Sequence, residues 1–229
     1  MIINSRVSRE VEAGPGRLPR GRHGLPAHVV QEHQRERLIW AMVTAVAEHG
    51  YGATTVGDVL ECSGVSRKTF YSIFNDKAEC FLCAYDALVD VLAARVTDAF
   101  VDGDEWSDQV RHGLQALLDQ FAERPAETRV GIVEGLAAGP LAFERYDRAL
   151  QRFVPLLDLG RAESPYGDEL PANLSETVVS GIAHLLYRRV SAGDTEELSH
   201  ELDELLYFAL APYLGHTRAT RIVRTGSTA

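Results

Sequence analysis

The chain has few cysteines, with three among its 229 residues. Three cysteines cannot supply the paired framework that stabilises small secreted proteins. No run of apolar residues reaches the ~18 that a membrane-spanning helix needs, and residues 1–26 lack the apolar stretch of a secretory signal. These absences predict a protein without membrane spans that works in the reducing cytoplasm.

The sequence also lacks the motifs of common catalytic and nucleotide-binding sites. It has no nucleophile elbow, no H-E-x-x-H, no Walker A loop and no complete G-x-G-x-x-G. Cys80 and Cys83 form a C-x-x-C, but no further Cys or His pair lies near enough in sequence to complete a zinc site. Packed, inert thiols are the favoured interpretation and a thiol sensor is the alternative. We therefore expect no catalytic residues, no metal and no cofactor.

Positive charge is scarce, and its distribution is uneven. The net charge is −10, which argues against a general nucleic-acid binder. Residues 1–75 hold nine basic and seven acidic residues, whereas residues 76–229 hold fourteen basic and twenty-six acidic residues. This uneven charge would orient the molecule on a polyanion, with the mildly basic residues 1–75 facing it and the acidic residues 76–229 directed away.

What the sequence has in abundance is helical periodicity. Apolar residues recur at spacings of three and four along most of the chain, which predicts an all-α fold of about nine helices. Residues 28–75 form a three-helix unit with two short helices, and residues 76–214 form a larger helical domain. Residues 1–27 are expected to be a flexible basic arm, and residues 215–229 a flexible tail.

The two short helices near residue 60 form the most informative pattern. Thr55 is a candidate N-cap, with Asp58 three residues later in a capping-box arrangement. Gly64 supplies the positive φ of a tight turn, and Ser66 is a second candidate N-cap. The helix that follows has an apolar face and a polar, basic face, which suits insertion into a DNA groove. The sequence therefore predicts a helix-turn-helix.

Residues 35–88 resemble the DNA-binding domain of the TetR (tetracycline-repressor-type) family. The resemblance is carried by Thr55-Val56, Gly64-Val65-Ser66, Thr69-Phe70-Tyr71, Phe74 and Lys77. One position departs, because Ile73 stands where the family often has His. The resemblance implies a homodimer whose C-terminal domain binds a small molecule and whose last two long helices form the dimer interface.

Nine residues are predicted to contact DNA. First-turn residues of the second short helix reach base edges, whereas Tyr71 and Lys77 contact phosphate. Arginines of the arm could enter a neighbouring minor groove, although a solvated tail is the alternative. The predicted contacts are Arg20, Arg22, Thr55, Ser66, Arg67, Lys68, Thr69, Tyr71 and Lys77.

Two further sets of residues are predicted in the larger domain. Aromatic and histidine side chains could line a ligand pocket between helices, although each alone is more readily explained as core: Trp106, Phe121, Phe143, Tyr146 and His184. Broad apolar stripes on the last two helices predict a dimer seam through Val178, Ile182, Leu185, Leu198, Leu202 and Leu205.

These observations together predict a ligand-responsive regulator that binds double-stranded DNA as a homodimer. In this family such a protein is most often a repressor that a small molecule releases from a palindromic operator. The alternative is a helical small-molecule carrier or enzyme whose first three helices are only structural. A scaffold would have no reason to expose Arg67, Lys68, Thr69 and Tyr71 together.

Overall fold

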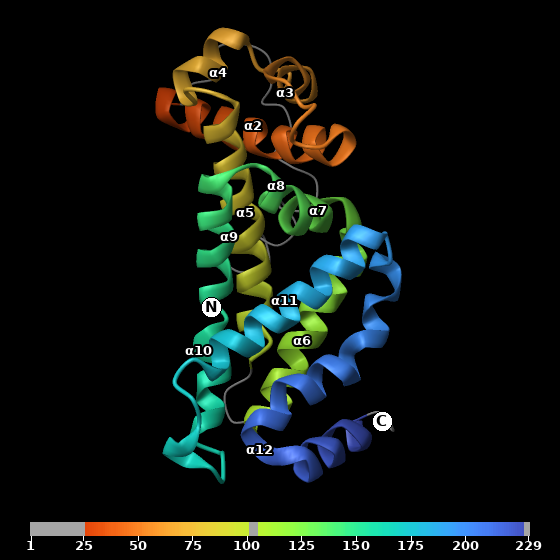
Figure 1. Cartoon of the computed structure of the whole chain (residues 1–229). Helices are drawn as coiled ribbons and strands as arrows, with labels where there is room; N and C mark the ends of the chain where they lie inside the picture. The colour runs from red at the N-terminus through yellow and green to blue at the C-terminus, as the bar shows by residue number, and fades with distance from the viewer. Residues whose placement is uncertain (1–25, 101–104, 227–229) are drawn as a thin grey trace. The chain divides into compact units, whose positions relative to one another are not determined.

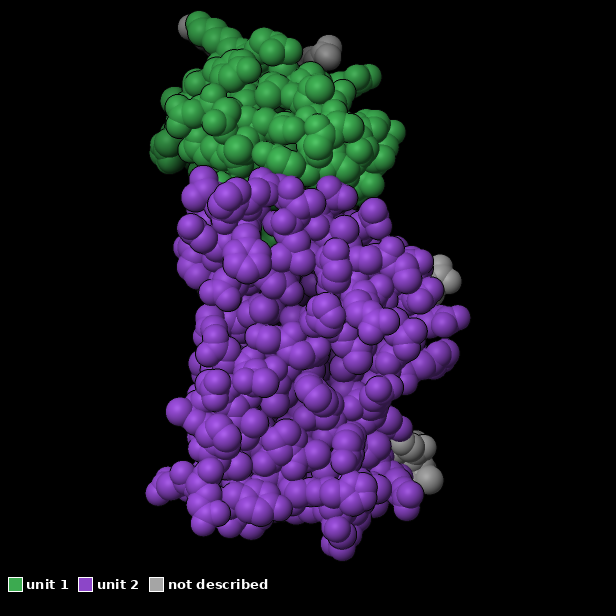
Figure 2. Space-filling view, viewed as in Figure 1, with its two compact units in different colours: residues 1–87 green, residues 88–229 purple. Residues whose placement is uncertain are grey.

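The computed structural model describes residues 26–100 and 105–226. Within these ranges the chain is helical and contains no strand, so the predicted all-α class is confirmed. Residues 1–25 of the predicted arm, with Arg20 and Arg22, lie outside the described residues, and its last residue, Ala27, begins α2. The chain divides into two compact units, one ending at Ala87 and one beginning at Leu88 (Figure 2). The sequence placed this division at residue 75, twelve residues earlier.

The first unit contains the predicted three-helix arrangement (Figure 1). Its helices are α2 (Ala27–His49), α3 (Val56–Ser63), α4 (Arg67–Ile73) and the first half of α5 (Lys77–Asp98). Burying apolar side chains from all four helices stabilises the unit, and the most deeply buried are Leu38, Met42, Val46, Val59, Phe70 and Phe81. The unit boundary falls inside α5 because Phe81 and Tyr85, early in that helix, belong to this first core.

The second unit is a larger helical bundle. It contains the rest of α5, α6 (Trp106–Glu123), α7 (Pro125–Arg129), the π-helix η1 (Val130–Glu134), α8 (Gly135–Ala137), α9 (Pro140–Gln151), α10 (Val154–Asp158), the 3₁₀ turns η2 (Leu159–Arg161) and η3 (Gly167–Glu169), α11 (Leu174–Ala192), the 3₁₀ segment η4 (Thr195–Glu201) and α12 (Leu202–Gly226). None of the described helices is long and apolar enough to cross a membrane.

Three segments of this unit depart from regular α-helix or from the sequence prediction. Residues 126–137 contain a π-helical segment, and residues 141–159 break at Arg152 and Phe153, before Pro155 in the first turn of α10. The segment predicted as a tail continues as helix to Gly226 after a kink at Gly215. It stays helical because Ala219 is fully buried and Ile222 packs against the core.

A partly buried network of polar side chains joins α10, α11 and α12. The hydroxyls of Ser175 and Tyr213 lie 2.6 Å apart, and Ser175 also donates to Asp158 Oδ1 at 2.5 Å. Arg161 Nε donates to the same carboxylate oxygen at 3.0 Å. The Ser175 and Arg161 hydrogen bonds lower the pKa of Asp158, although partial burial opposes them. This connected network holds the three helices in a single arrangement.

Candidate functional site

The helix-turn-helix begins with the capping box that the sequence predicted. The Thr55 hydroxyl accepts a hydrogen bond from the Asp58 N–H at 3.4 Å, and Asp58 Oδ2 accepts from the Thr55 N–H at 2.7 Å. The Thr55 hydroxyl also donates to Asp58 Oδ2 at 2.9 Å. The backbone and hydroxyl bonds from Thr55 lower the pKa of the Asp58 carboxyl. These reciprocal bonds fix the start of α3.

The turn between α3 and α4 is anchored at both ends. Gly64 has φ 63°, a left-handed conformation that glycine adopts without the steric cost of a Cβ. The Ser63 hydroxyl accepts a hydrogen bond from the Val65 N–H at 3.2 Å. On the other side, the Arg37 guanidinium of α2 donates to the Ser63 carbonyl. The turn is therefore attached to the helix that braces it.

The short helix α4 presents a polar, cationic surface. Ser66 caps it by accepting from the Thr69 N–H at 3.1 Å. Phe70 is fully buried and anchors the opposite face, with its ring 5.7 Å from that of Phe74. Arg67 and Lys68 are exposed and Tyr71 is 52% exposed. Since α4 carries no acidic residue, these side chains can face a polyanion without repulsion.

Three of the predicted DNA contacts, Ser66, Thr69 and Lys77, also make hydrogen bonds within the chain. The hydroxyls of Ser66 and Thr69 lie 2.8 Å apart, so they are already hydrogen-bonded to each other. Lys77 is half-buried, and its Nζ donates to the carbonyls of Tyr51 and Thr54, each at 2.8 Å. The same ammonium lies 4.2 Å from the centre of the Tyr51 ring. Lys77 therefore fastens the turn that connects α2 to α3.

The C-x-x-C lies on the buried side of α5. Burial raises the pKa of the Cys80 thiol to about 12, which keeps this sulfur protonated and poorly reactive at neutral pH. Cys83 is half-buried, and its sulfur accepts a hydrogen bond from Arg35 Nη2 at 3.4 Å. Across the described parts of the chain, no group of His, Cys, Asp and Glu side chains could hold a metal ion.

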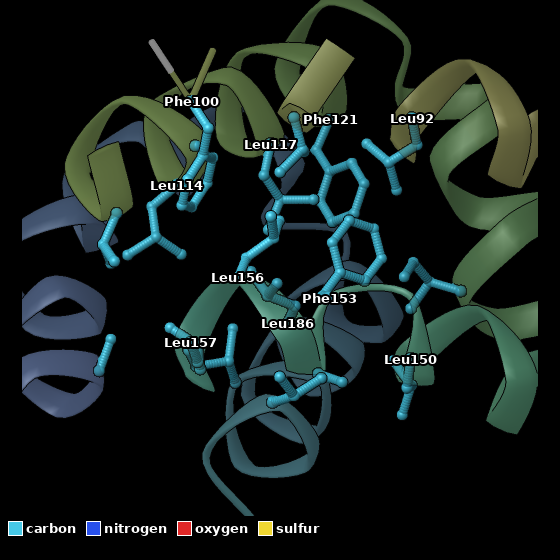
Figure 3. A pocket seen from close by; sticks show the side chains of 18 residues that line it. Leu92, Phe100, Leu114, Leu117, Phe121, Leu150, Phe153, Leu156, Leu157 and Leu186 are labelled. Atoms are coloured by element: carbon cyan, nitrogen blue, oxygen red, sulfur yellow. The ribbon is translucent and has the colours of Figure 1, made fainter. Parts of the chain in front are cut away.

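A cavity of about 120 Å³ lies inside the second unit. Figure 3 shows leucine and phenylalanine side chains converging on it from several helices. The lining comes from α5 and the residues that follow it, from α6, η1, α9 and the segment joining α9 to α10, and from α10, α11 and α12. Every lining residue is apolar or glycine: Leu92, Val96, Phe100, Val110, Gly113, Leu114, Leu117, Phe121, Ile132, Leu150, Phe153, Leu156, Leu157, Val179, Ile182, Ala183, Leu186 and Ala209.

Only one of the five predicted pocket residues, Phe121, lines this cavity. Trp106 is buried elsewhere, where its Nε1 donates to the Leu156 carbonyl at 3.0 Å and its ring centre lies 5.0 Å from that of Tyr213. Phe143 is 56% exposed and His184 is exposed, whereas Tyr146 is half-buried outside the lining. Aromatic character did not identify the residues that line the cavity, because aliphatic side chains supply most of its wall.

The six residues of the predicted dimer seam are buried or half-buried within their own unit. Val178, Ile182, Leu198 and Leu205 are buried in the core of their own unit, and Leu185 and Leu202 pack against that core. A side chain already buried within one chain leaves no surface for a second copy. The exposed apolar residues of α12 are instead Tyr207 and Phe208, which are 37% and 46% exposed.

Phe208 packs against a glycine on the neighbouring helix. A Cβ built on Gly181 of α11 would lie 2.9 Å from the Phe208 ring, closer than such atoms approach. The glycine therefore allows α11 and the exposed Phe208 ring to form one smooth surface. Sequence periodicity alone could not reveal this, since Gly181 has no side chain to contribute to an apolar stripe.

Comparison with known proteins agrees with this geometry. Residues 41–84 match the family described as "Bacterial regulatory proteins, tetR family". The chain is 27% identical to the HTH-type transcriptional repressor AcnR of Corynebacterium diphtheriae over 183 residues, which cover 74% of this chain and 88% of that protein.

Solved structures share the fold at low sequence identity. The fatty acid degradation regulator FadR from Bacillus halodurans has a TM-score of 0.68 and 16% identity, covering 77% of this chain and 94% of that one. FadR from Bacillus subtilis, in complex with stearoyl-CoA, has a TM-score of 0.64 and 16% identity, covering 78% and 97%. The match over residues 41–84 and the similarity to these regulators support a transcriptional regulator of the TetR family.

Proposed function

We propose that the chain binds a palindromic DNA operator as a homodimer and represses transcription until a small molecule releases it. The observation that supports DNA binding most directly is the exposed face of α4. Arg67, Lys68 and Tyr71 lie on this face, and buried Phe70 anchors the opposite face of the same helix. First-turn side chains of such a helix reach base edges in the major groove. One short helix covers few base pairs, so two copies would read two half-sites.

The contacts divide into two classes by chemistry. Arg67 and Lys68 would read base edges, because a guanidinium or an ammonium can donate to guanine O6 and N7. Tyr71, Thr55 and Ser66 would position the protein on the DNA by contacting phosphate groups of the DNA backbone. Lys77 already makes two hydrogen bonds to carbonyls, and its third N–H donor could reach a phosphate. The arm residues Arg20 and Arg22 remain proposed minor-groove contacts.

The proposed dimer seam lies on the exposed surface of α11 and α12. Phe208, packed against Gly181, supplies the apolar centre of this seam. His184 of α11 and Tyr207 of α12 are also exposed on these two helices. A two-fold interface is self-complementary, so a single such patch would serve both copies.

The effector site that we propose is the apolar cavity of the second unit. Its size and its purely apolar lining suit a hydrocarbon group. The related fold of FadR from Bacillus subtilis, which was solved with stearoyl-CoA, is consistent with an effector that carries such a group. By linkage, an effector that weakens operator binding must itself bind less tightly in the presence of operator, by the same factor.

The decisive experiment is selection of bound DNA from a random pool, followed by ligand screening against the selected complex. We expect a palindromic sequence, bound by two copies. Enrichment of no sequence above background would refute the proposal that the chain reads DNA.

A further inference from the structure

Two thiols lie one helical turn apart near the start of α5, and they differ in exposure. Cys80 is fully buried, whereas Cys83 is half-buried. Residues three apart on a helix share a face, with Cβ atoms about 5–6 Å apart. Burial first, and then the neighbouring Cys83 sulfur, raises the pKa of Cys80. Both thiols belong to the unit that carries the helix-turn-helix, and the proposed DNA contacts use neither of them.

An arginine of α2 contacts the more accessible sulfur. Arg35 Nη2 donates a hydrogen bond to Cys83 Sγ at 3.4 Å, and the Arg35 side chain is 39% exposed, so small solutes reach this contact. A guanidinium has five N–H donors, and Arg35 Nη1 meets a Glu32 carboxylate oxygen only at 3.8 Å. Donors of this kind stabilise negative charge that develops during a reaction. Arg35 is therefore placed to assist a reaction in which the Cys83 sulfur attacks and an oxygen anion leaves.

The third cysteine has the opposite environment. Cys62 of α3 is exposed, and its neighbours are acidic. Partial burial, then the carboxylate of Glu48 and those of two further acidic residues, raise the pKa of the Cys62 thiol. A raised pKa lowers the fraction of reactive thiolate. Exposure alone would make Cys62 the first thiol to react, whereas the charge of the neighbouring side chains favours Cys83.

We propose that Cys83 and Cys80 are a redox-active pair that a hydroperoxide converts into a disulfide within α5. The Cys83 thiolate attacks one oxygen of the peroxide, the oxygen–oxygen bond breaks, and the sulfur becomes a sulfenic acid. The departing oxygen takes up the proton that the thiol released and leaves as water or an alcohol. The Cys80 sulfur then attacks the Cys83 sulfur, the sulfur–oxygen bond breaks, and hydroxide leaves with the Cys80 proton as water. The two thiols thereby give two electrons to the peroxide.

The burial of Cys80 suits its role in the second step. Its sulfur lies out of reach of solutes, and its pKa of about 12 keeps it from attacking the peroxide itself. Its position one turn from Cys83 makes the second step intramolecular, which raises the effective concentration of the attacking thiol. The disulfide also removes the sulfenic acid before a second peroxide converts it into the irreversible sulfinic acid.

A disulfide between these two positions requires α5 to tighten. The Cβ atoms must approach from about 5–6 Å on a regular helix to about 3.5–4.5 Å. The turn that tightens contains Phe81, whose ring centre lies 4.6 Å from that of Tyr51. It also follows Lys77, which donates to the Tyr51 and Thr54 carbonyls. Oxidation should therefore loosen the turn before α3 and weaken operator binding. This effect on the operator rests on the proposed function, whereas the disulfide itself does not.

The test treats the reduced full chain with hydrogen peroxide and follows it by mass spectrometry. We expect the wild-type chain to lose the mass of two hydrogen atoms, peptide mapping to show the Cys80–Cys83 bond, and dithiothreitol to restore both thiols. In Cys80→Ala, dimedone should trap a sulfenic acid on Cys83. In Cys83→Ser, the remaining thiols should stay reduced under the same treatment. Cys62→Ser is the matched control and should be oxidised as fast as the wild type.

Variants of Arg35 separate its role in the reaction from mere accessibility of the sulfur. Arg35→Gln should slow the oxidation of Cys83 about tenfold, the low end of the effect of a hydrogen bond to a charged group. Arg35→Lys keeps the positive charge and should recover part of the rate. An unchanged rate in Arg35→Gln would show that the arginine does not assist the reaction.

Two results on the thiols would overturn the inference. One is oxidation of Cys62 before Cys83 in the wild-type chain, which needs no variant to observe, and the other is oxidation of Cys83→Ser at the wild-type rate. Operator affinity is then compared for the reduced and oxidised chains, and we expect it to fall about tenfold on oxidation and to recover with dithiothreitol. Full affinity of the oxidised chain would refute the link to DNA binding. A reduced chain that selects no DNA sequence refutes the proposed function, and the thiol measurements still decide whether the disulfide forms.

Discussion

Replacing Lys77 with methionine should loosen the turn between α2 and α3. Methionine keeps an apolar stem of similar length but removes the ammonium that donates to the Tyr51 and Thr54 carbonyls at 2.8 Å. It also removes the cation 4.2 Å from the Tyr51 ring. Thr54 is a buried residue, 2% exposed, so water can only partly replace the lost donor there.

The magnitude follows from these contacts. A hydrogen bond to a charged group contributes about 1.5–3 kcal/mol, and a partly exposed cation–π contact adds about 0.5–1 kcal/mol. Because Lys77 is half-exposed and the two carbonyls share one ammonium, we expect a total near the low end, about 2–3 kcal/mol. Local opening of residues 50–63 should then be about 30- to 160-fold more frequent.

Hydrogen exchange followed by mass spectrometry measures this opening directly. Peptides from α3 and the preceding turn should exchange faster in Lys77→Met, while peptides from α6 and α11 should be unaffected. Lys68→Met is the matched control, because Lys68 is exposed on α4 and its exchange effect should be negligible. Wild-type exchange rates in Lys77→Met would show that these hydrogen bonds do not stabilise the turn. The salt dependence of DNA binding tests the separate phosphate contact proposed for Lys77. Loss of that contact should lower the slope of log K against log salt concentration by about one per half-site.

Three further predictions follow from the same structure. Thr55 lowers the pKa of Asp58 in the folded chain. The stabilising effect of this cap is therefore present above the ordinary pKa of aspartate and is lost as the pH falls through the lower pKa of the folded state. An NMR titration of the α3 amides should show a midpoint below about 3.9, and an unshifted midpoint would contradict this prediction. Phe208→Glu should give a folded monomer in analytical ultracentrifugation, whereas Leu159→Glu, at a 54% exposed leucine outside the proposed seam, should remain dimeric; a dimeric Phe208→Glu would place the seam elsewhere. Arg67→Ala should reduce the free energy of operator binding by about 1–3 kcal/mol, through lost discrimination at one base pair of each half-site, in a quantitative binding assay. An equal loss of affinity for random DNA would show that Arg67 contacts the DNA backbone and not a base.

The helix-turn-helix could be predicted from the sequence because its determinants are local. The Thr55–Asp58 capping box, the Ser66 cap and the positive φ of Gly64 each depend on residues within three or four positions of one another. Such interactions form wherever the local sequence permits them, so their spacing in the chain is enough to recognise them.

The second unit was predicted less completely. A stripe of apolar residues along a helix shows that this face of the helix is buried, but it does not show which element covers it. Val178 and Leu205 belong to stripes that were predicted to meet a second copy, yet they are buried against neighbours in their own chain. The cavity depends in the same way on residues from α5 to α12 that share no sequence pattern. The π-helix at Val130–Glu134 also has no periodic signature, since its apolar spacing fits an ordinary helix.

The sequence by itself therefore determined the helical class, the caps of α3 and α4, and the polar face of α4. Only the tertiary structure decided the partners of long side chains, as for Lys77, whose two carbonyls lie 23 and 26 residues away in the chain. The physical reason is the range of the interactions. Caps and turns are set by neighbouring residues, whereas cavities, ion pairs between helices and exposed seams depend on how distant helices pack together.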